Sequence, residues 1–215
     1  MGSAFAKLAR AKVHLDALRN EVHEYRGRKP LQFEALTTNH PDGSSRLIAK
    51  VVAQVKEEIP SGRSVVIGDI LTNLRASLDH AIYGHVIDSH AYIDETKVAA
   101  GIKLPITANL REWRREENRL APLVAPSVLK TIAQIQCFQP DQPSEENHAL
   151  IAFNKLVNRD KHRSIRPVFI AATRIEIAYS GLEVEEFHTT PGPFSDGGVV
   201  GIAVLRLPKA KALQL

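Results

Sequence analysis

The sequence predicts an α+β protein, and three observations carry this prediction. Residues 3–27 keep apolar side chains at helical spacing, and residues 65–91 form a second helical stretch that lacks the usual surface residues. Alternating apolar residues, which are typical of strands, occur near the N-terminus and again near the C-terminus. Because no internal repeat or low-complexity tract interrupts the chain, we expect a single α+β domain over residues 1–215. Its helical part is expected at about 1–28 and 61–163, and its β part at about 31–57 and 165–207.

The N-terminal helix is expected to pack along another helix. Its apolar residues follow a 3,4 spacing for about three heptads, and they are Phe5, Leu8, Ala11, Leu15, Leu18, Val22 and Tyr25. Gly27 and Pro30 end the helix, because neither residue continues one. A β-hairpin is expected next, since alternating stretches at 31–35 and 47–55 flank the turn-forming sequence NHPDGSS.

The rest of the chain is expected to add short helices and further strands. The sequence IKLPI at 102–106 predicts a short strand, and residues 108–119 and 127–135 predict short helices around a proline-bounded loop. A longer helix is expected at 147–163, followed by three or more strands between 168 and 207. We therefore expect two polar-lined helices packed together, beside an antiparallel sheet built from the hairpin and the C-terminal strands.

The helix at 65–91 has almost none of the long charged residues that a solvent-exposed helix usually carries. It has no Lys and no Glu, and Arg75 is its single Arg, so its polar side chains are predicted to be buried. One face is apolar. The side chains of the opposite face are short or polar, so this face would admit another helix or a ligand. Its residues are Asp69, Asn73, Ala76, Ser77, His80 and Gly84. Arg75 and Asp79 lie four residues apart and are expected to pair along the helix.

A second polar helix offers the partner that these groups need, because buried polar groups are costly without hydrogen bonds. In residues 147–163, Asn147, Asn154 and Asn158 recur at helical spacing, and a run of four ionisable residues follows at 160–163. A solvated helix end, where the dipole favours cations, is the alternative for this run. We expect the two helices to contact. The binding or network residues would be Asp69, Asn73, Asp79, Asn158, Asp160, Lys161 and Arg163.

Composition bounds the classes of protein to which the chain can belong. With 215 residues, 44% of them hydrophobic, it can bury a sizeable core. Its single cysteine, Cys137, excludes an internal disulfide and a Cys-rich zinc site, which suits the cytoplasm. No apolar run approaches the roughly 18 residues of a membrane span, and no signal-peptide core is present, so we expect a cytoplasmic protein without a membrane partner. The net charge of +4 permits RNA as a partner without requiring it.

Arg75 and His80 have the chemistry needed to cleave RNA without a metal. The guanidinium would hold the phosphate oxygens, and the imidazole would act as base or acid when the 2′-hydroxyl attacks the phosphodiester. His162 would serve as a second acid or base, so the catalytic candidates are Arg75, His80 and His162, with no metal and no other cofactor. Arg75 and His80 lie about 140° apart on an ideal helix. A site that uses both therefore needs a bent helix or a second chain.

The R-x-x-x-x-H pattern of Arg75 and His80 resembles the signature of the HEPN superfamily, which includes toxin and phage-defence endoribonucleases. This resemblance implies a metal-independent endoribonuclease or RNA-binding protein of the defence or toxin type, and a homodimer in which the two motifs meet. A second resemblance rests on GD-x-L-x-N-L-R-x-x-L-D-H at 68–80 and N-x-D-K-H-R at 158–163. This combination is similar to a group of bacterial and phage-associated proteins, which brings no assigned activity.

Two other functions fit the same residues. In the first, the polar residues of both motifs form a buried network that locks the two helices in register, in a non-catalytic structural or interaction protein. In the second, the protein is a metal-dependent hydrolase whose carboxylates and imidazoles bind Zn, Mn or Fe. The candidate ligands would be Asp69, Asp79, His80, Asp160 and His162. No H-E-x-x-H or comparable ligand spacing supports that metal site.

Overall fold

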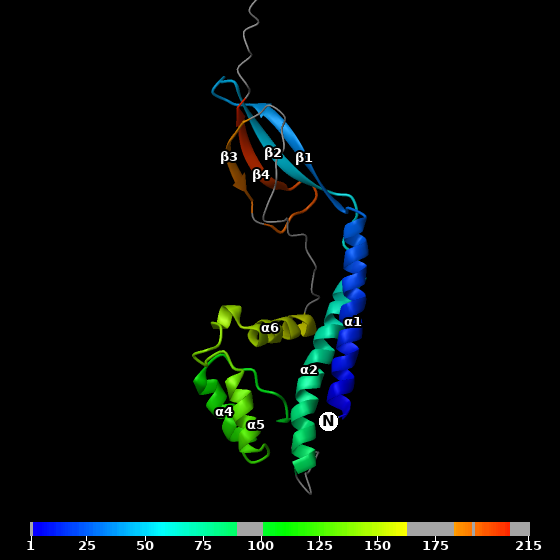
Figure 1. The fold of residues 1–215 in the computed structure, drawn as a ribbon, viewed down its shortest axis with the longest axis vertical. Helices are drawn as coiled ribbons and strands as arrows, with labels where there is room; N and C mark the ends of the chain where they lie inside the picture. Colours follow the sequence, from blue (N-terminus) through cyan, green and yellow to red (C-terminus); the bar gives the residue numbers. More distant parts are fainter. Residues whose placement is uncertain (1, 90–100, 163–182, 191, 207–215) are drawn as a thin grey trace, which may run out of the picture. The chain divides into compact units, whose positions relative to one another are not determined.

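The computed structural model describes residues 2–89, 101–162, 183–190 and 192–206 (Figure 1). Helices and a four-stranded antiparallel sheet share the chain, so the predicted α+β class is confirmed. The chain divides into two compact units, which we call the helical unit (Met1–Glu21 with Ser61–Arg166) and the β unit (Val22–Pro60 with Pro167–Leu215). The single α+β domain expected over residues 1–215 stays a prediction.

The helical unit is built around one long helix, α2 (Gly62–Ser89). The part of α1 (Gly2–Gly27) that belongs to this unit runs along one side of α2, as expected for a helix with 3,4 spacing (Figure 1). Arg63, at the start of α2, donates a hydrogen bond to the carbonyl oxygen of Glu21 in α1 at 3.2 Å. On the other side, α6 (Ala149–His162) contacts α2 and is preceded by the short 3-10 turn η2 (Glu145–Asn147).

Two short helices, α4 (Leu110–Leu120) and α5 (Pro126–Gln134), supply much of the core of the helical unit. Asn109 caps α4, because its side-chain oxygen accepts a hydrogen bond from the N–H of Glu112 at 3.0 Å. The core side chains come from α2, from both short helices and the turn between them, and from the segment before α4. They are Ile82, Val86, Ile102, Leu104, Trp113, Leu120, Val124, Leu129 and Ile132.

The β unit contains a four-stranded antiparallel sheet in the order β1-β2-β4-β3. Its strands are β1 (Leu31–Asn39), β2 (Arg46–Val55), β3 (Glu183–Thr189) and β4 (Val199–Arg206). The predicted hairpin is confirmed as β1 and β2, and Asp42 stabilises its turn by accepting a hydrogen bond from the N–H of Ser44 at 3.0 Å. The small core of the sheet consists of Ala49, Ala203 and Leu205.

The segment 102–106 is not the strand that its sequence predicted. It belongs to no sheet among the described residues, and side chains rather than a neighbouring strand hydrogen-bond its backbone. The alternation of apolar residues is real, because Ile102 and Leu104 both enter the core. The strands expected between 168 and 182 lie outside the described residues.

Candidate functional site

Arg75 and Asp79 form the ion pair that their four-residue spacing predicted. The guanidinium Nε donates to Asp79 Oδ2 at 3.0 Å, and Nη2 lies 2.9 Å from Oδ1. Only 14% of the Arg75 side chain and 28% of the Asp79 side chain are exposed. The two charges are therefore joined by two contacts and are only partly screened by water.

The same ion pair binds the backbone of Leu104. Arg75 Nη2 donates to the carbonyl oxygen of Leu104 at 2.8 Å, and the Leu104 N–H donates to Asp79 Oδ1 at 3.0 Å. A buried backbone needs hydrogen-bond partners for both its N–H and its carbonyl oxygen. The ion pair supplies both partners to Leu104, as a neighbouring strand would in a sheet. We call this arrangement the Arg75/Asp79 clamp.

Gln136 holds the next residues of the same segment, and the sequence did not mark it as a candidate. Its side-chain oxygen accepts hydrogen bonds from the N–H and the hydroxyl of Thr107, at 2.8 and 3.1 Å. Its side-chain nitrogen donates to the carbonyl oxygens of Pro105 and Ile132. The buried amide thus uses both donors and both acceptor positions. The only sequence signal for it was one polar residue in the otherwise apolar run IQCF.

At Gly68 the backbone of α2 meets α6 directly. A Cβ atom on Gly68 would lie 2.7 Å from Asp160 Oδ2 and 3.0 Å from Asp160 Cγ, so no larger residue fits without movement. Asp160 is half-buried in the last turn of α6. A glycine inside a helix is usually destabilising, and this close approach explains its presence. The contact joins the two sequence motifs and confirms that the two polar helices pack together.

His80 has a different neighbour from Arg75. Its Nδ1 atom lies 2.8 Å from the hydroxyl oxygen of Ser3 in α1, a contact that the sequence did not indicate. Arg75 instead contacts Asp79 and the backbone of Leu104. Within the described ranges, no hydrogen bond or ion pair joins Arg75 to His80. Their angular separation of about 140° on the helix accounts for this.

The buried polar network is smaller than the sequence predicted. Asp69 and Asn158 are exposed, so the expectation that they belong to a buried network is wrong, and Lys161 is exposed as well. The cause is geometric, because these residues lie on parts of α2 and α6 that the packing of the described residues leaves open to solvent. Asn73 is half-buried, and its side-chain nitrogen donates to the carbonyl oxygen of Asp69 in the same helix. For Lys161, the solvated helix end is the interpretation that fits.

The described part of the chain contains no group of three His, Cys, Asp or Glu residues that could hold a metal ion. Arg163 and the side chain of His162 lie outside the residues described. Cys137 is buried, and this burial raises the pKa of its thiol, with the negative charge of Glu145 raising it further. A thiol in this environment is a poor nucleophile.

Comparison of the chain with protein-family models, with curated proteins and with solved structures gives no match. The resemblances to the HEPN superfamily and to the phage-associated group therefore stay predictions from the motifs. None of the helices in the described ranges is long and apolar enough to span a membrane. The function must be inferred from the side chains themselves, and above all from the Arg75/Asp79 clamp.

Proposed function

We propose that the chain is a non-catalytic interaction protein of the cytoplasm, in which residues 68–80 act as a structural element. The observation that carries this proposal is the Arg75/Asp79 clamp on Leu104. The most distinctive residues of the motif stabilise the helical unit. Surfaces that take no part in the clamp then remain to bind a partner.

Arg75 supports this proposal because its guanidinium is already engaged. To hold the phosphate oxygens of RNA through the same nitrogens, Arg75 would have to leave both Asp79 and the carbonyl oxygen of Leu104. Breaking one side of a buried ion pair costs about 3–5 kcal/mol, and partial exposure of this pair reduces the cost to about 2–3 kcal/mol. A phosphate contact would have to offset that cost.

The alternative function is the one that the HEPN resemblance implies, a metal-independent endoribonuclease that acts on RNA as a homodimer. Its catalytic residues would be Arg75, His80 and His162. His80 is the residue that favours this alternative, because it is half-buried and its described hydrogen bond goes to the exposed side chain of Ser3. A substrate hydroxyl could replace that of Ser3 without disturbing the clamp.

RNA cleavage distinguishes these functions. Purified protein is incubated with mixed RNAs in EDTA, beside His80→Ala and beside His23→Ala, an exposed histidine of α1 that serves as the matched control. We expect all three proteins to leave the RNA intact. Cleavage in EDTA that His80→Ala abolishes and His23→Ala retains would contradict the proposal and support the ribonuclease. Cleavage only after a divalent metal is added would instead favour the metal-dependent hydrolase.

A further inference from the structure

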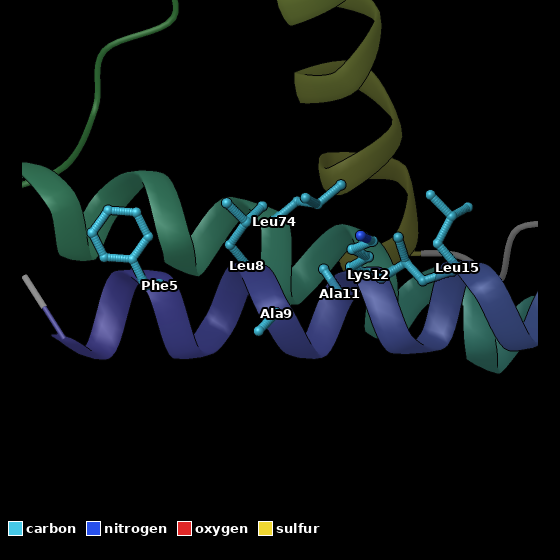
Figure 2. Close-up of a pocket in the computed structure, with 8 residues that line it drawn as sticks. Phe5, Leu8, Ala9, Ala11, Lys12, Leu15 and Leu74 are labelled. Carbon is cyan, nitrogen blue, oxygen red and sulfur yellow. The ribbon is translucent and has the colours of Figure 1, made fainter.

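An apolar groove lies between α1 and α2 on the surface of the helical unit (Figure 2). Its volume is about 590 Å³, and the side chains that shape it are Phe5, Leu8, Lys12 and Leu15 of α1 with Ile70 and Leu74 of α2. Phe5 is 66% exposed and Leu8 is 47% exposed. Apolar surface left in water is unfavourable, and a continuous patch of it marks an interaction site.

Small and large residues of α1 lie next to one another along the groove. Ala4 and Ala11 are buried, whereas Phe5 and Leu8 are exposed. Phe5 and Leu8 project from α1, with Leu74 of α2 near Leu8 (Figure 2). Because both walls are regular helices, the groove is preformed, and a partner binding there would order little of this protein.

The α1 wall of the groove carries the positive charge of Lys12, and this part of α1 is basic. Between residues 2 and 15 this helix carries Lys7, Arg10 and Lys12 and no Asp or Glu. Lys12 itself lines the groove. The first carboxylate further along α1, that of Asp16, is paired with Arg19 at 3.4 Å. A partner that carries negative charge beside an apolar face would be attracted to this wall.

We propose that the groove binds an amphipathic helix of another protein, with acidic residues flanking its apolar face. The wall from Phe5 to Leu15 is about 15 Å long at 1.5 Å per residue, which matches about three turns of a partner helix. Such a helix would insert apolar side chains at positions i, i+3 or i+4, and i+7. Its carboxylates would then lie beside Lys12. This inference rests on the proposed function, because it names the partner of a non-catalytic interaction protein.

Two other occupants fit the groove less well. A second copy of the chain would insert the same surface of α1, which brings Lys12 of one copy toward Lys12 of the other, where little water would remain to screen them. A membrane would attract exposed apolar and basic residues, but a flat lipid surface would leave the hollow between the helices unfilled. An acidic amphipathic helix would both fill the hollow between the two helices and complement the positive charge beside it.

Titration with designed peptides tests the inference. The probe is a fluorescein-labelled peptide of about 14 residues with leucines at i, i+3, i+7 and i+10 and mainly glutamates elsewhere, and fluorescence anisotropy follows its binding to the full chain. One control peptide has the same residues in scrambled order, and the other has lysines in place of the glutamates. We expect the acidic peptide to bind at least about tenfold more tightly than either control. Its affinity should fall as salt is added.

Two protein variants then locate the binding site. Leu8→Glu places a carboxylate in the groove and should weaken binding of the acidic peptide at least about tenfold. Val13→Glu is the matched control, because Val13 is also 66% exposed on α1 but does not line the groove. It should change the affinity by no more than about twofold. Circular dichroism and the Tm of both variants establish that they are folded.

Absence of binding by the acidic peptide, or binding that Leu8→Glu leaves unchanged, would overturn the inference. Sedimentation equilibrium that shows a dimer dissociated by Leu8→Glu would also overturn it and would assign the groove to a second copy. Binding to phosphatidylserine vesicles that the same variant loses would overturn it in favour of a membrane. Any of these results leaves the proposed function standing if no RNA is cleaved, whereas His80-dependent cleavage would reject that function whatever the peptide does.

Discussion

The substitution Asp79→Ala should destabilise the protein by about 2–3 kcal/mol. It removes at once the acceptor of the Leu104 N–H and the counter-ion of Arg75. A buried N–H without a partner costs about 1–3 kcal/mol, and an unpaired guanidinium costs about 3–5 kcal/mol at full burial. Two features reduce the sum to about 2–3 kcal/mol: water reaches this site, and Arg75 keeps its hydrogen bond to the Leu104 carbonyl oxygen.

Urea denaturation measures this change as a lower transition midpoint at an unchanged slope. Asp69→Ala is the matched control, because Asp69 is an exposed carboxylate on the same helix and its removal should cost no more than about 0.5 kcal/mol. Equal effects of the two substitutions would refute the clamp as a source of stability. In a double-mutant cycle, Arg75→Ala should cost less in the Asp79→Ala background than in the wild type.

Three further predictions concern the contacts around the clamp. Gly68→Ala should destabilise the protein by about 1 kcal/mol, because its Cβ would meet Asp160 Oδ2 at 2.7 Å and displace that carboxylate, while the better helix propensity of alanine offsets part of the cost. Gly62→Ala, where the Cβ meets open space, should not, and equal urea midpoints would contradict this difference. Cys137 should react with DTNB far more slowly in the folded than in the unfolded protein, because burial raises its thiol pKa. A similar rate in both states would place the thiol at the surface. Gln136→Ala should cost about 2–3 kcal/mol by removing the side chain that binds segment 102–107, and an unchanged thermal melt would exclude that role.

Most of the helices and strands could be predicted because their signals are local. The apolar spacing within residues 3–27 predicted α1, and Asp42 with Gly43 marked the turn of the hairpin. The lack of Lys and Glu in α2 also predicted its contact with α6, because a helix with few residues suited to solvent must be covered.

The segment 102–106 was predicted wrongly because its hydrogen-bond partners lie far away in the sequence. Alternating apolar residues look the same whether a neighbouring strand or a set of side chains satisfies the backbone. Here the partners are Arg75, Asp79 and Gln136, which lie 29, 25 and 31 residues from the groups that they bind. No local pattern connects them.

The candidate site could be predicted only where a single helix defines it. The pairing of Arg75 with Asp79 follows from helical periodicity alone. The contact of His80 with Ser3 depends on which face of α2 is covered by α1, and the exposure of Asn158 depends on the neighbours of α6. These are tertiary properties, so the polar stripes indicated a site without showing which residues would be buried.

Hydrogen exchange at the Leu104 amide tests the central claim most directly, because that claim is that Arg75 and Asp79 hold a backbone segment. We predict that this amide exchanges slowly in the native protein although it belongs to no sheet. Asp79→Ala should raise its exchange rate at least about tenfold, while amides within α5 change less. A Leu104 amide that exchanges as fast as in an unfolded chain, or whose rate Asp79→Ala leaves unchanged, would contradict the clamp.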